Sequence, residues 1–447
     1  MHMKSPMANA LTIAGSDSVG GAGLQADLKA FEAVGVHTCS VVTCVTSQNT
    51  KGVSSIFPVP TKEIASQLDS VLEDVKLDAI KTGMLYTPEI VRLVASKLKG
   101  VRAPLVVDPV LAATTGSTLH RAGLVDALTT KLLPLCTLVT PNLPEAQSLT
   151  GVKVKDEKSA RKAALEIMEF GPRAVLIKGG HLKGPEAADY LFKGGRVFKF
   201  TSPRVDVEVH GTGCAFASMI AAHLAIDDDL REAVRKSKGM IYKAILSRET
   251  VGAGVPCANP LAVLRIAASK TPMLEELDEM GDSLESLDPG LIPEVGINVG
   301  YALVGALEPE EVAAFEGRVV RVGRGGKKTG CAKFGASKHV ARIVLAAMSH
   351  DPDMRCAMNM KYSEKNLSAC RRANLTISTF DRAEEPEGVS SMTWGVHKAI
   401  SDFGSVPDVI YDKGGIGKEP MIRLLGKDID DVDLKLVRMM DKWMPRG

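Results

Sequence analysis

The sequence lacks an excess of either charge. Lys and Arg number 55 and Asp and Glu number 53 among 447 residues, which gives no reason to expect nucleic acid or an anionic membrane as a partner. It also lacks a charged segment followed by an apolar one at its start, so we expect no secretory signal. The longest apolar stretch, Cys214–Ile226, contains His223 and is too short to span a bilayer. We therefore expect a cytoplasmic protein without a membrane partner.

Paired cysteine motifs are absent as well. None of the eight cysteines forms a Cys-x-x-Cys pair, which argues against a structural zinc site. Most of them stand in apolar runs, where a reduced cysteine packs as a small apolar side chain. A chain of this length can bury a full core without disulfides. The sequence therefore predicts a globular protein of a reducing compartment.

Short apolar segments alternate with helical periods from Ala10 to about Ala268. The apolar segments show little polar alternation, which suits strands that helices cover on both faces. We expect strands at Ala10–Gly15, Cys39–Thr46, Ala79–Leu85, Leu105–Val110, Thr137–Pro141 and Ala174–Gly179. This order predicts an α/β fold with a doubly wound, mostly parallel sheet.

The character of the sequence changes near Lys270. Thr271-Pro272 interrupts the chain, and an acidic segment, Glu275–Asp288, follows, with an apolar spacing that favours a helix over a linker. A shorter α/β alternation occupies the rest, with strands expected at Arg318–Val322, Leu375–Phe380 and Pro407–Tyr411. We therefore expect two domains, 7–268 and a second, smaller α/β domain at 272–447.

The first chemical feature is the turn His210–Ala215, which opens an apolar helix. Glycines let the backbone approach a ligand, and the free N–H groups of a helix start bind anions. Gly211 and Gly213 could therefore stabilise a phosphoryl group during its transfer. Cys214, at the helix N-terminus, is expected to have a lowered pKa and to act as a base. A small buried cysteine after a tight turn is the alternative, and the turn alone does not decide between them.

Two further features stand where expected strands end. Asn142 and Glu145 offer an amide and a carboxylate at the edge where open α/β sheets bind ligands, which suits Mg²⁺ beside phosphates. An ordinary helix capping box is the commoner meaning of this pair. Lys178 opens the run Lys178–His181, which places a cation beside two glycines. The segment Gly15–Gly23 is also glycine-rich but matches neither a dinucleotide fingerprint nor a Walker loop.

Together these motifs resemble the ribokinase-like superfamily, and the resemblance is closest to hydroxymethylpyrimidine/phosphomethylpyrimidine kinases. It is carried by Ala10–Asp17, Gly20–Lys29, Ser47–Thr50, Lys81–Leu85, Val107–Val110, Thr140–Glu145 and Lys178–His181. The resemblance implies ATP-dependent phosphorylation of 4-amino-5-hydroxymethyl-2-methylpyrimidine, first to the monophosphate and then to the diphosphate. Cysteine at position 214 is also typical of some pyridoxal kinases, so phosphorylation of vitamin B6 stays open as a side activity.

The same resemblance assigns roles to individual residues. The pyrimidine site would comprise Gly15, Asp27, Gln48 and Met84, with Gln48 and Asp27 hydrogen-bonding the aminopyrimidine and Met84 packing on its ring. ATP and Mg²⁺ would be served by Asp108, Asn142, Glu145 and Lys178, with Glu145 on the metal ion. Gly211, Gly213 and Cys214 would carry the transfer itself.

The C-terminal part contains two cationic runs. Ser337 is a suitable N-cap for a helix whose first turns carry Lys338, His339 and Arg342, an arrangement that suits an anion. A solvated basic face is the alternative. The second run, Tyr411–Pro420, has glycines between Lys413 and Lys418. It is not a Walker motif, but such a loop can wrap a diphosphate.

The segment from about Leu291 onward resembles the archaeal-type thiamine-phosphate synthase domain, which occurs fused behind this kinase. The resemblance is carried by Leu291–Asn298, Glu316–Arg318, Phe334–Arg342, Met358–Ser363, Thr393–Gly395 and Pro407–Asp412. It implies that hydroxymethylpyrimidine diphosphate is joined to a thiazole phosphate with loss of diphosphate. The functional Arg and His of the family map to Arg318 and His339. The charge of the leaving diphosphate would fall to Mg²⁺ or to Lys338, Arg342, Lys413 and Lys418.

The same domain also occurs in regulators, where it senses thiamine compounds behind a DNA-binding module. A kinase with a non-catalytic, sensing tail is therefore the alternative. No basic DNA-binding module precedes the tail, and both Arg318 and His339 are present, which favours the synthase. A pyridoxal salvage kinase with a degenerate tail is a third interpretation. We expect small-molecule substrates and a homo-oligomer, while channelling and the thiazole phosphate site stay open.

Overall fold

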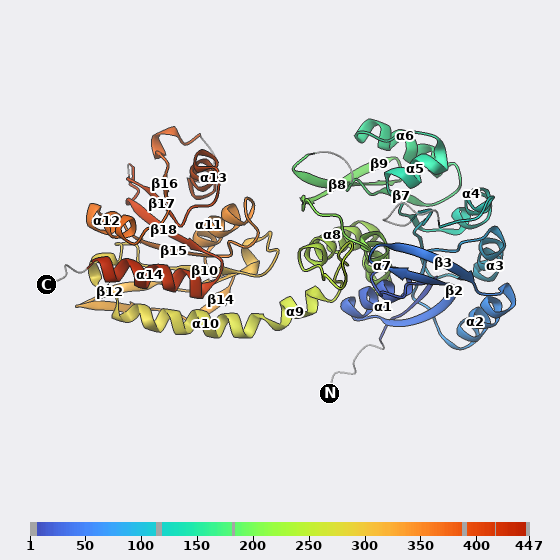
Figure 1. Cartoon of the computed structure of the whole chain (residues 1–447), viewed down its shortest axis with the longest axis horizontal. Coiled ribbons are helices and arrows are strands. Elements are labelled where there is room, and N and C mark those ends of the chain that lie inside the picture. The colour runs from blue at the N-terminus through green and yellow to red at the C-terminus, as the bar shows by residue number, and fades with distance from the viewer. Residues whose placement is uncertain (1–6, 113–118, 181–183, 387–390, 416, 444–447) are drawn as a thin grey trace. The chain divides into compact units, whose positions relative to one another are not determined.

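The computed structural model describes residues 7–112, 119–180, 184–386, 391–415 and 417–443 (Figure 1). The chain divides into two units between Leu264 and Arg265. All eight cysteines are free thiols. In the described ranges, no helix has both the length and the apolar character needed to cross a membrane. His181 and Ile416, which belong to two of the sequence motifs, lie outside the described residues.

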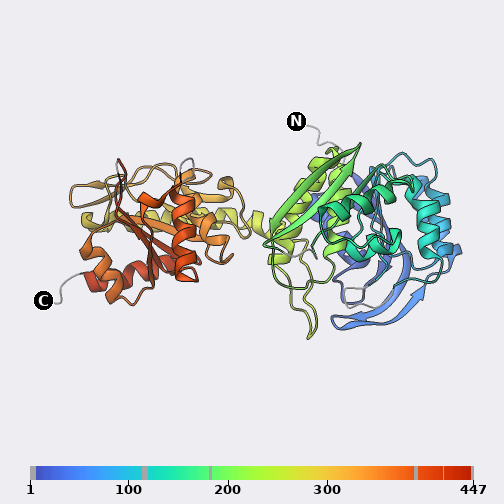
Figure 2. The same cartoon turned by 90° about the horizontal axis from the view of Figure 1, so that it is seen from above.

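A nine-stranded sheet forms the centre of the first unit. From edge to edge its strands are β3 (Gly52–Pro58), β2 (His37–Asn49), β1 (Asn9–Ser16), β4 (Ala79–Thr82), β5 (Leu105–Val107), β6 (Leu138–Val139), β7 (Ala174–Ile177), β8 (Glu186–Lys193) and β9 (Arg196–Pro203). The strands from β2 to β7 are parallel, whereas β3, β8 and β9 pair antiparallel. Figure 2 shows the β2–β3 and β8–β9 hairpins, blue and green, at opposite ends of this sheet. The predicted mostly parallel, doubly wound sheet is confirmed.

Helices cover both faces of this sheet because its central strands are apolar on both sides. One face is packed by α1 (Gly23–Val34), α7 (Thr212–Ala225) and α8 (Leu230–Leu246). The other is packed by α2 (Thr61–Asp74), α3 (Pro88–Leu98), α4 (Leu124–Ala127), α5 (Leu143–Thr150) and α6 (Glu157–Met168). Since the central strands are parallel, their C-terminal ends lie at one edge, where loops can bring polar side chains together.

The second unit has a seven-stranded sheet that is mostly antiparallel. Its order is β14 (Ala332–Phe334), β11 (Val312–Phe315), β10 (Val299–Ala302), β15 (Cys356–Lys361), β18 (Met421–Gly426), β17 (Val409–Asp412) and β16 (Ile377–Thr379). Only the pair β16 and β17 is parallel among those pairings. The expected strand at Arg318–Val322 exists as β12 (Val319–Val322), but it pairs with β13 (Gly325–Lys328) in a separate hairpin.

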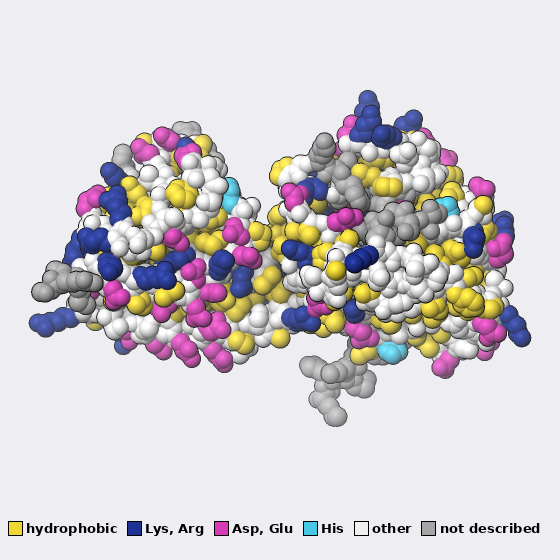
Figure 3. Space-filling model, viewed as in Figure 1, with side chains coloured by type: hydrophobic (Ala, Val, Ile, Leu, Met, Phe, Trp, Pro, Cys, Tyr) yellow, Lys and Arg dark blue, Asp and Glu magenta, His cyan; other side chains and the backbone are white. Residues whose placement is uncertain are grey.

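Two helical layers sandwich the second sheet, which confirms the expected α/β class of this part. One face carries α11 (Lys338–Met348) and α13 (Ser391–Phe403). The opposite face carries α10 (Lys270–Ser283), α12 (Glu364–Arg372) and α14 (Ile429–Trp443). The acidic segment after Lys270 is therefore helical, as its apolar spacing predicts. On the face shown in Figure 3, each unit carries both acidic and basic side chains, in keeping with the balanced charge.

Candidate functional site

A cleft of about 980 Å³ opens at the C-terminal ends of the parallel strands in the first unit. Its walls include most of the residues that the sequence singles out, namely Gly15, Gln48, Met84, Asp108, Asn142, Glu145, Lys178, Gly211, Gly213 and Cys214. The parallel topology explains this convergence, because each of β1, β4, β5, β6 and β7 ends at the same edge. The structure thus brings residues from almost 200 positions of sequence into one cavity.

Two glycines shape the start of α7, and at Gly211 no larger residue would fit. Gly211 has φ +82°, and a Cβ built on it would lie 1.8 Å from the carbonyl oxygen of Gly21. A Cβ on Gly213 would lie 3.2 Å from Lys178 Nζ and 3.9 Å from Asp108 Oδ2. The start of the helix, where the backbone N–H groups have no partner within the helix, therefore lies beside a lysine and a carboxylate of the cleft wall.

Lys178 stands between two carboxylates of the cleft. Its Nζ lies 2.7 Å from Asp108 Oδ1 and 3.9 Å from Glu145 Oε2. Glu145 is fixed by a capping box, in which Asn142 N donates to Glu145 Oε2 and Glu145 N donates to Asn142 Oδ1, each at 2.8 Å. The ordinary capping geometry is therefore real, and it also holds the carboxylate of Glu145 inside the cleft.

The electrostatics of this cluster suit a divalent cation. Burial raises the pKa of Glu145 to about 7, with Asp108 adding to the rise and Lys178 opposing it. Two carboxylates thus share one lysine, and a cation beside them would relieve their repulsion. In the part of the chain that the structure describes, no three His, Cys, Asp or Glu side chains are arranged so that they alone could hold a metal ion. The residues fit Mg²⁺, which takes one or two carboxylates and completes its shell with water and phosphate oxygens.

The structure corrects the expectation for the Cys214 thiol. Burial raises the pKa of Cys214 to about 11; the charge of Lys81 opposes this, and the carboxylates of Asp108 and Asp27 add to it. The position at the start of α7 therefore does not make Cys214 a thiolate at neutral pH in the free protein. A catalytic base at this position needs the pKa to fall when substrate and nucleotide enter the cleft.

Asp27 is not among the residues that line the cleft. Its side chain is fully buried, and both carboxylate oxygens lie 2.8 Å from Lys81 Nζ. Thr12 Oγ1 and Ser218 Oγ also donate to it, at 2.6 and 2.7 Å. These donors occupy the acceptor positions of the Asp27 carboxylate to which a pyrimidine would have to donate. Asp27 instead pairs the buried cation of Lys81, as a buried charge requires.

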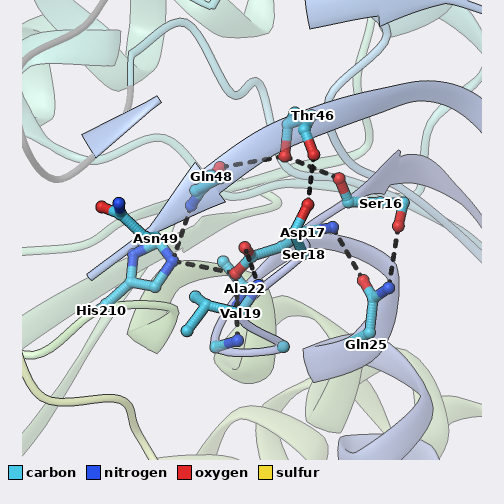
Figure 4. Close-up of polar contacts among 12 residues, drawn as sticks. Ser16, Asp17, Ser18, Val19, Ala22, Gln25, Thr46, Gln48, Asn49 and His210 are labelled. Carbon is cyan, nitrogen blue, oxygen red and sulfur yellow. Dashed lines mark hydrogen bonds and ion pairs between the residues drawn. The ribbon is translucent and has the colours of Figure 1, made fainter. Parts of the chain in front are cut away.

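Two residues of the cleft lining, Asp17 and His210, were not singled out by the sequence analysis, although both stand inside quoted motifs. His210 Nε2 lies 3.1 Å from Asp17 Oδ2 and 2.9 Å from Gln48 Nε2 (Figure 4). Asp17 follows β1, Gln48 is the last residue but one of β2, and His210 precedes α7; all three line the cleft. Only the three-dimensional pairing shows that His210 links the other two.

The second unit places two of the expected residues in a common electrostatic environment. Arg318, half-buried, donates from Nη1 to the carbonyl oxygen of Val295 at 2.7 Å. His339 is exposed in the first turn of α11. Partial removal from water and the positive charges of four arginines, Arg423, Arg318, Arg382 and Arg342, lower the pKa of His339 to about 4. The positive charge of Arg318 therefore acts on His339.

The other cations that the sequence predicts for this site have different surroundings. Arg342 acts on His339, while Lys338 and Lys413 are exposed. Lys418 Nζ pairs with Glu385 Oε2 at 3.1 Å. The sequence analysis missed Arg423, which lies inside an apolar strand.

Two family models match the chain. One, described as phosphomethylpyrimidine kinase, covers residues 17–259, which is more than half of the chain. The other, described as thiamine-phosphate synthase ThiN, covers residues 276–438. The two matches fall in the two structural units.

Relatives match either the whole chain or the first unit. The bifunctional thiamine biosynthesis protein ThiDN of Methanocaldococcus jannaschii is 34% identical over 97% of this chain and 98% of its own length. The thiamine biosynthesis bifunctional protein ThiED of Geobacter sulfurreducens is 47% identical over 56% of this chain, and the match spans only 51% of that protein. A hydroxymethylpyrimidine/phosphomethylpyrimidine kinase of Streptomyces coelicolor is 45% identical over 55% of this chain and 91% of its own.

Solved structures resemble the first unit. The pyridoxal kinase from Staphylococcus aureus in complex with AMP-PCP and pyridoxal has a TM-score of 0.55 at 33% identity, over 59% of this chain and 96% of that one. An ADP complex of Bacillus subtilis pyridoxal kinase has a TM-score of 0.54 at 35% identity, over 58% of this chain and 99% of that one. These neighbours confirm the expected ribokinase-like fold.

Proposed function

The chain belongs to the phosphomethylpyrimidine kinase family and carries a thiamine-phosphate synthase domain, and from this premise we propose that it makes thiamine phosphate in two stages. The first unit phosphorylates 4-amino-5-hydroxymethyl-2-methylpyrimidine with ATP and then phosphorylates the monophosphate. The second unit joins the resulting diphosphate to a thiazole phosphate and releases inorganic diphosphate. The observation that carries the proposal is a single cleft lined by Gln48 and Met84 together with Asp108, Glu145, Lys178 and the start of α7.

In the kinase step, Gln48 would bind the aminopyrimidine edge while Met84 packs on the ring. The hydroxyl oxygen attacks the terminal phosphorus of ATP, a new O–P bond forms, and the bond to ADP breaks. Lys178 and the N–H groups at Gly211 and Gly213 stabilise the charge on the transferring group. Mg²⁺, when bound, neutralises phosphate charge, and Cys214 lies in the cleft wall as the candidate acceptor of the hydroxyl proton.

In the coupling step, the bond between the pyrimidine methylene carbon and the diphosphate oxygen breaks. The electron-rich aminopyrimidine supports the developing positive charge on that carbon, and the thiazole nitrogen forms the new C–N bond. Arg318 and the neighbouring cations hold the departing diphosphate. His339, whose low pKa keeps it neutral near pH 7, can accept a hydrogen bond or a proton at this site.

Finer statements also belong to this proposal. The two catalytic domains would be 7–268 and 272–447, Mg²⁺ would accompany ATP at Glu145, and the enzyme would be a cytoplasmic homo-oligomer. The free state of all eight cysteines supports a reducing compartment. Pyridoxal is a second candidate substrate of the kinase cleft, because a neighbouring fold at 33% identity is solved with pyridoxal and AMP-PCP.

One experiment tests the assignment. The full chain is incubated with hydroxymethylpyrimidine, ATP, Mg²⁺ and thiazole phosphate, and thiamine phosphate and diphosphate are measured together. We expect both products in equal amounts. Accumulation of hydroxymethylpyrimidine diphosphate without diphosphate release would establish the alternative, a kinase with a sensing tail. The same assay with pyridoxal in place of the pyrimidine measures the side activity.

A further inference from the structure

A lysine is buried behind the wall of the kinase cleft. Lys81 is the third residue of β4, and it is 0% exposed. Ala79, two positions earlier, packs in the apolar layer of α1 and α7, so strand alternation directs Lys81 to the same face. A Cβ built on Gly83 would lie 2.8 Å from Lys81 Nζ. The ammonium group therefore stands at the C-terminal end of β4, close behind Met84, which lines the cleft.

The partner of this lysine ties α1 to α7. Asp27, in α1, has both carboxylate oxygens 2.8 Å from Lys81 Nζ. Ser218, in α7, donates from Oγ to Asp27 Oδ1 at 2.7 Å. Cys214 stands four residues before Ser218, on the same face of α7. Helix side chains lean toward the N-terminus, so the Ser218 hydroxyl points toward the turn that begins with Cys214. The ion pair of Asp27 and Lys81 therefore adjoins Cys214.

The starts of α1 and α7 meet at the same place. Gly211 is the N-cap of α7 and Ala22 is the N-cap of α1. A Cβ built on Gly211 would lie 1.8 Å from the carbonyl oxygen of Gly21 and 3.3 Å from Ala22 Cα. The first N–H groups of a helix have no partner within the helix and favour negative charge nearby. Burial raises the pKa of the Cys214 thiol, and the N–H of Gly23, the first residue of α1, opposes this rise.

Two ion pairs flank Cys214. Lys81 on β4 pairs with Asp27 of α1 at 2.8 Å. Lys178, after β7, pairs with Asp108, after β5, at 2.7 Å. Burial alone would lower the pKa of Lys81, but Asp27 raises it above its ordinary value, and Cys214 and Asp108 add to the rise, so Lys81 keeps its charge. Burial raises the pKa of Cys214; Lys81 is the charge that opposes this most strongly, whereas Asp108 and Asp27 add to it.

An ion pair of this kind does little for stability by itself. Taking two charges out of water costs about as much as their attraction returns, and apolar replacements are often equally stable. Position 81 borders the apolar layer of α1 and α7, where an apolar side chain would pack without that cost. The charge of Lys81 is therefore better explained by its neighbour Cys214 than by the fold.

We infer that Lys81, held in place by Asp27, is a positioning residue of the kinase whose fixed positive charge stabilises the thiolate form of Cys214. The inference rests on the proposed function and deepens it, because it names what supports the candidate proton acceptor. The Cys214 thiol first loses its proton to solvent. The thiolate then accepts the hydroxyl proton of the substrate while the new O–P bond forms and the bond to ADP breaks. Lys81 keeps its protons throughout.

The first test is the rate at which iodoacetamide labels Cys214 in the full chain at about pH 9. Lys81→Met should label about tenfold more slowly than the wild type, which corresponds to a rise of about one unit in the pKa of the thiol. Because this variant leaves Asp27 unpaired, the double variant Lys81→Met/Asp27→Asn accompanies it and removes both buried charges. It should also label more slowly, since Lys81 outweighs Asp27 at Cys214. Peptide mass spectrometry follows the site, with exposed Cys331 as internal comparison.

Kinase turnover gives a second readout. In both variants kcat should fall by about tenfold near neutral pH, and its rise with pH should move up by about one unit. KM for ATP and for the pyrimidine should change little, because Lys81 is not among the residues that line the cleft. A loss of packing alone would lower kcat by the same factor at every pH.

Thr12→Val is the matched control. Thr12 Oγ1 donates to Asp27 Oδ2 at 2.6 Å, so the variant disturbs the same cluster and leaves both charges in place. It should melt at a lower temperature but label Cys214 at the wild-type rate. Wild-type labelling and an unshifted pH profile in both Lys81 variants would overturn the inference, and so would equal slowing in Thr12→Val.

The inference and the proposed function fail in different ways. If labelling slows as expected but the wild type does not phosphorylate the pyrimidine, the proposed substrate falls and the role of Lys81 at the Cys214 thiol stands. If the wild type phosphorylates the pyrimidine and the Lys81 variants label and turn over at its rate, the kinase assignment stands and Lys81 only supports the fold.

Discussion

His210 and Asp17 are 193 positions apart, yet His210 Nε2 lies 3.1 Å from Asp17 Oδ2 in the kinase cleft. Burial would raise the pKa of Asp17, but hydrogen bonds from His210 and from the N–H groups of Ala22 and Val19 hold it below its usual value. Asp17 is therefore an anion that accepts hydrogen bonds only. It follows that His210 Nε2 carries a proton and donates it to this pair.

That proton decides how Gln48 is oriented. Gln48 Nε2 lies 2.9 Å from His210 Nε2. Gln48 Oε1 lies 3.3 Å from Thr46 Oγ1, and the hydroxyl hydrogen of Thr46 already binds the Ser16 carbonyl oxygen at 2.9 Å. Two donors cannot face each other, and a half-turn of the amide exchanges its oxygen and nitrogen. With the oxygen toward His210 and the nitrogen toward Thr46, every donor meets an acceptor. The remaining donor and acceptor positions of Gln48 would then serve the pyrimidine that we propose as substrate.

His210→Ala should therefore raise KM for the pyrimidine by about 2- to 10-fold, the effect of one hydrogen bond. Gln48→Ala should raise it more, because the recognition group itself is lost. KM for ATP should change little in either variant. The control is His37→Ala, which removes an exposed histidine at the start of β2. Equal increases for both substrates would indicate a collapsed cleft rather than lost recognition.

Glu145 should make Mg²⁺ binding depend on pH. Its pKa near 7 means that the side chain is protonated below about pH 7 and must lose that proton to hold the metal ion. The apparent Kd for Mg²⁺, measured from the rate at saturating ATP, should rise up to about tenfold for each pH unit below 7 and level off above it. Glu145→Gln should bind Mg²⁺ weakly and without this dependence. Exposed Glu157→Gln should behave like the wild type, whereas a flat profile in the wild type would remove Glu145 from the metal site.

The fold was predictable where the sequence carries a local signal. The helices Gly23–Val34 and Thr61–Asp74 form where the sequence shows a clear apolar periodicity. Strand β3 is not predicted, since its serines give no strand signal and pairing with β2 holds it in place. The same applies to β13, whose sequence Gly-Gly-Lys-Lys acquires its structure from pairing with β12.

The site was predictable to the extent that parallel topology fixes it. Residues at strand ends, such as Asp108 and Lys178, meet because their strands run in one direction. Asp27 and Cys214 show the limit of this reasoning. Lys81, distant in sequence, binds Asp27, and burial together with neighbouring carboxylates sets the pKa of Cys214. Arg423 was missed because an apolar strand gives no sign of the carboxylate that meets it in space.

Cys214 should react slowly with thiol reagents in the free protein. A pKa of about 11 leaves it a thiol at neutral pH, so labelling by iodoacetamide should still be accelerating above pH 9. Exposed Cys331 is the internal comparison, and peptide mass spectrometry follows both sites. Cys214→Ala should lower kcat by about 10²- to 10⁴-fold, the usual contribution of a general base. An unchanged kcat would mean that Cys214 only packs against the turn and that transfer rests on the N–H groups of α7.

The neutral state of His339 leads to the last prediction. Its pKa of about 4 lies below the ordinary histidine value because of partial removal from water and the surrounding arginines. In the unfolded chain His339 binds a proton more readily, so its contribution to stability should rise as the pH increases from about 4 to about 6.5.

A bound diphosphate would offset the arginine charges and raise the pKa of His339 again. Diphosphate binding at pH 6 should therefore take up protons from solution, which calorimetry in buffers of different ionisation enthalpy measures directly. His339→Ala should bind diphosphate with less proton uptake, and it should lower the rate of thiamine phosphate formation more than the affinity for diphosphate. His350→Ala, an exposed histidine later in the same region of the chain, should leave both quantities unchanged. Equal proton uptake in the His339 variant and the wild type would place His339 away from the diphosphate.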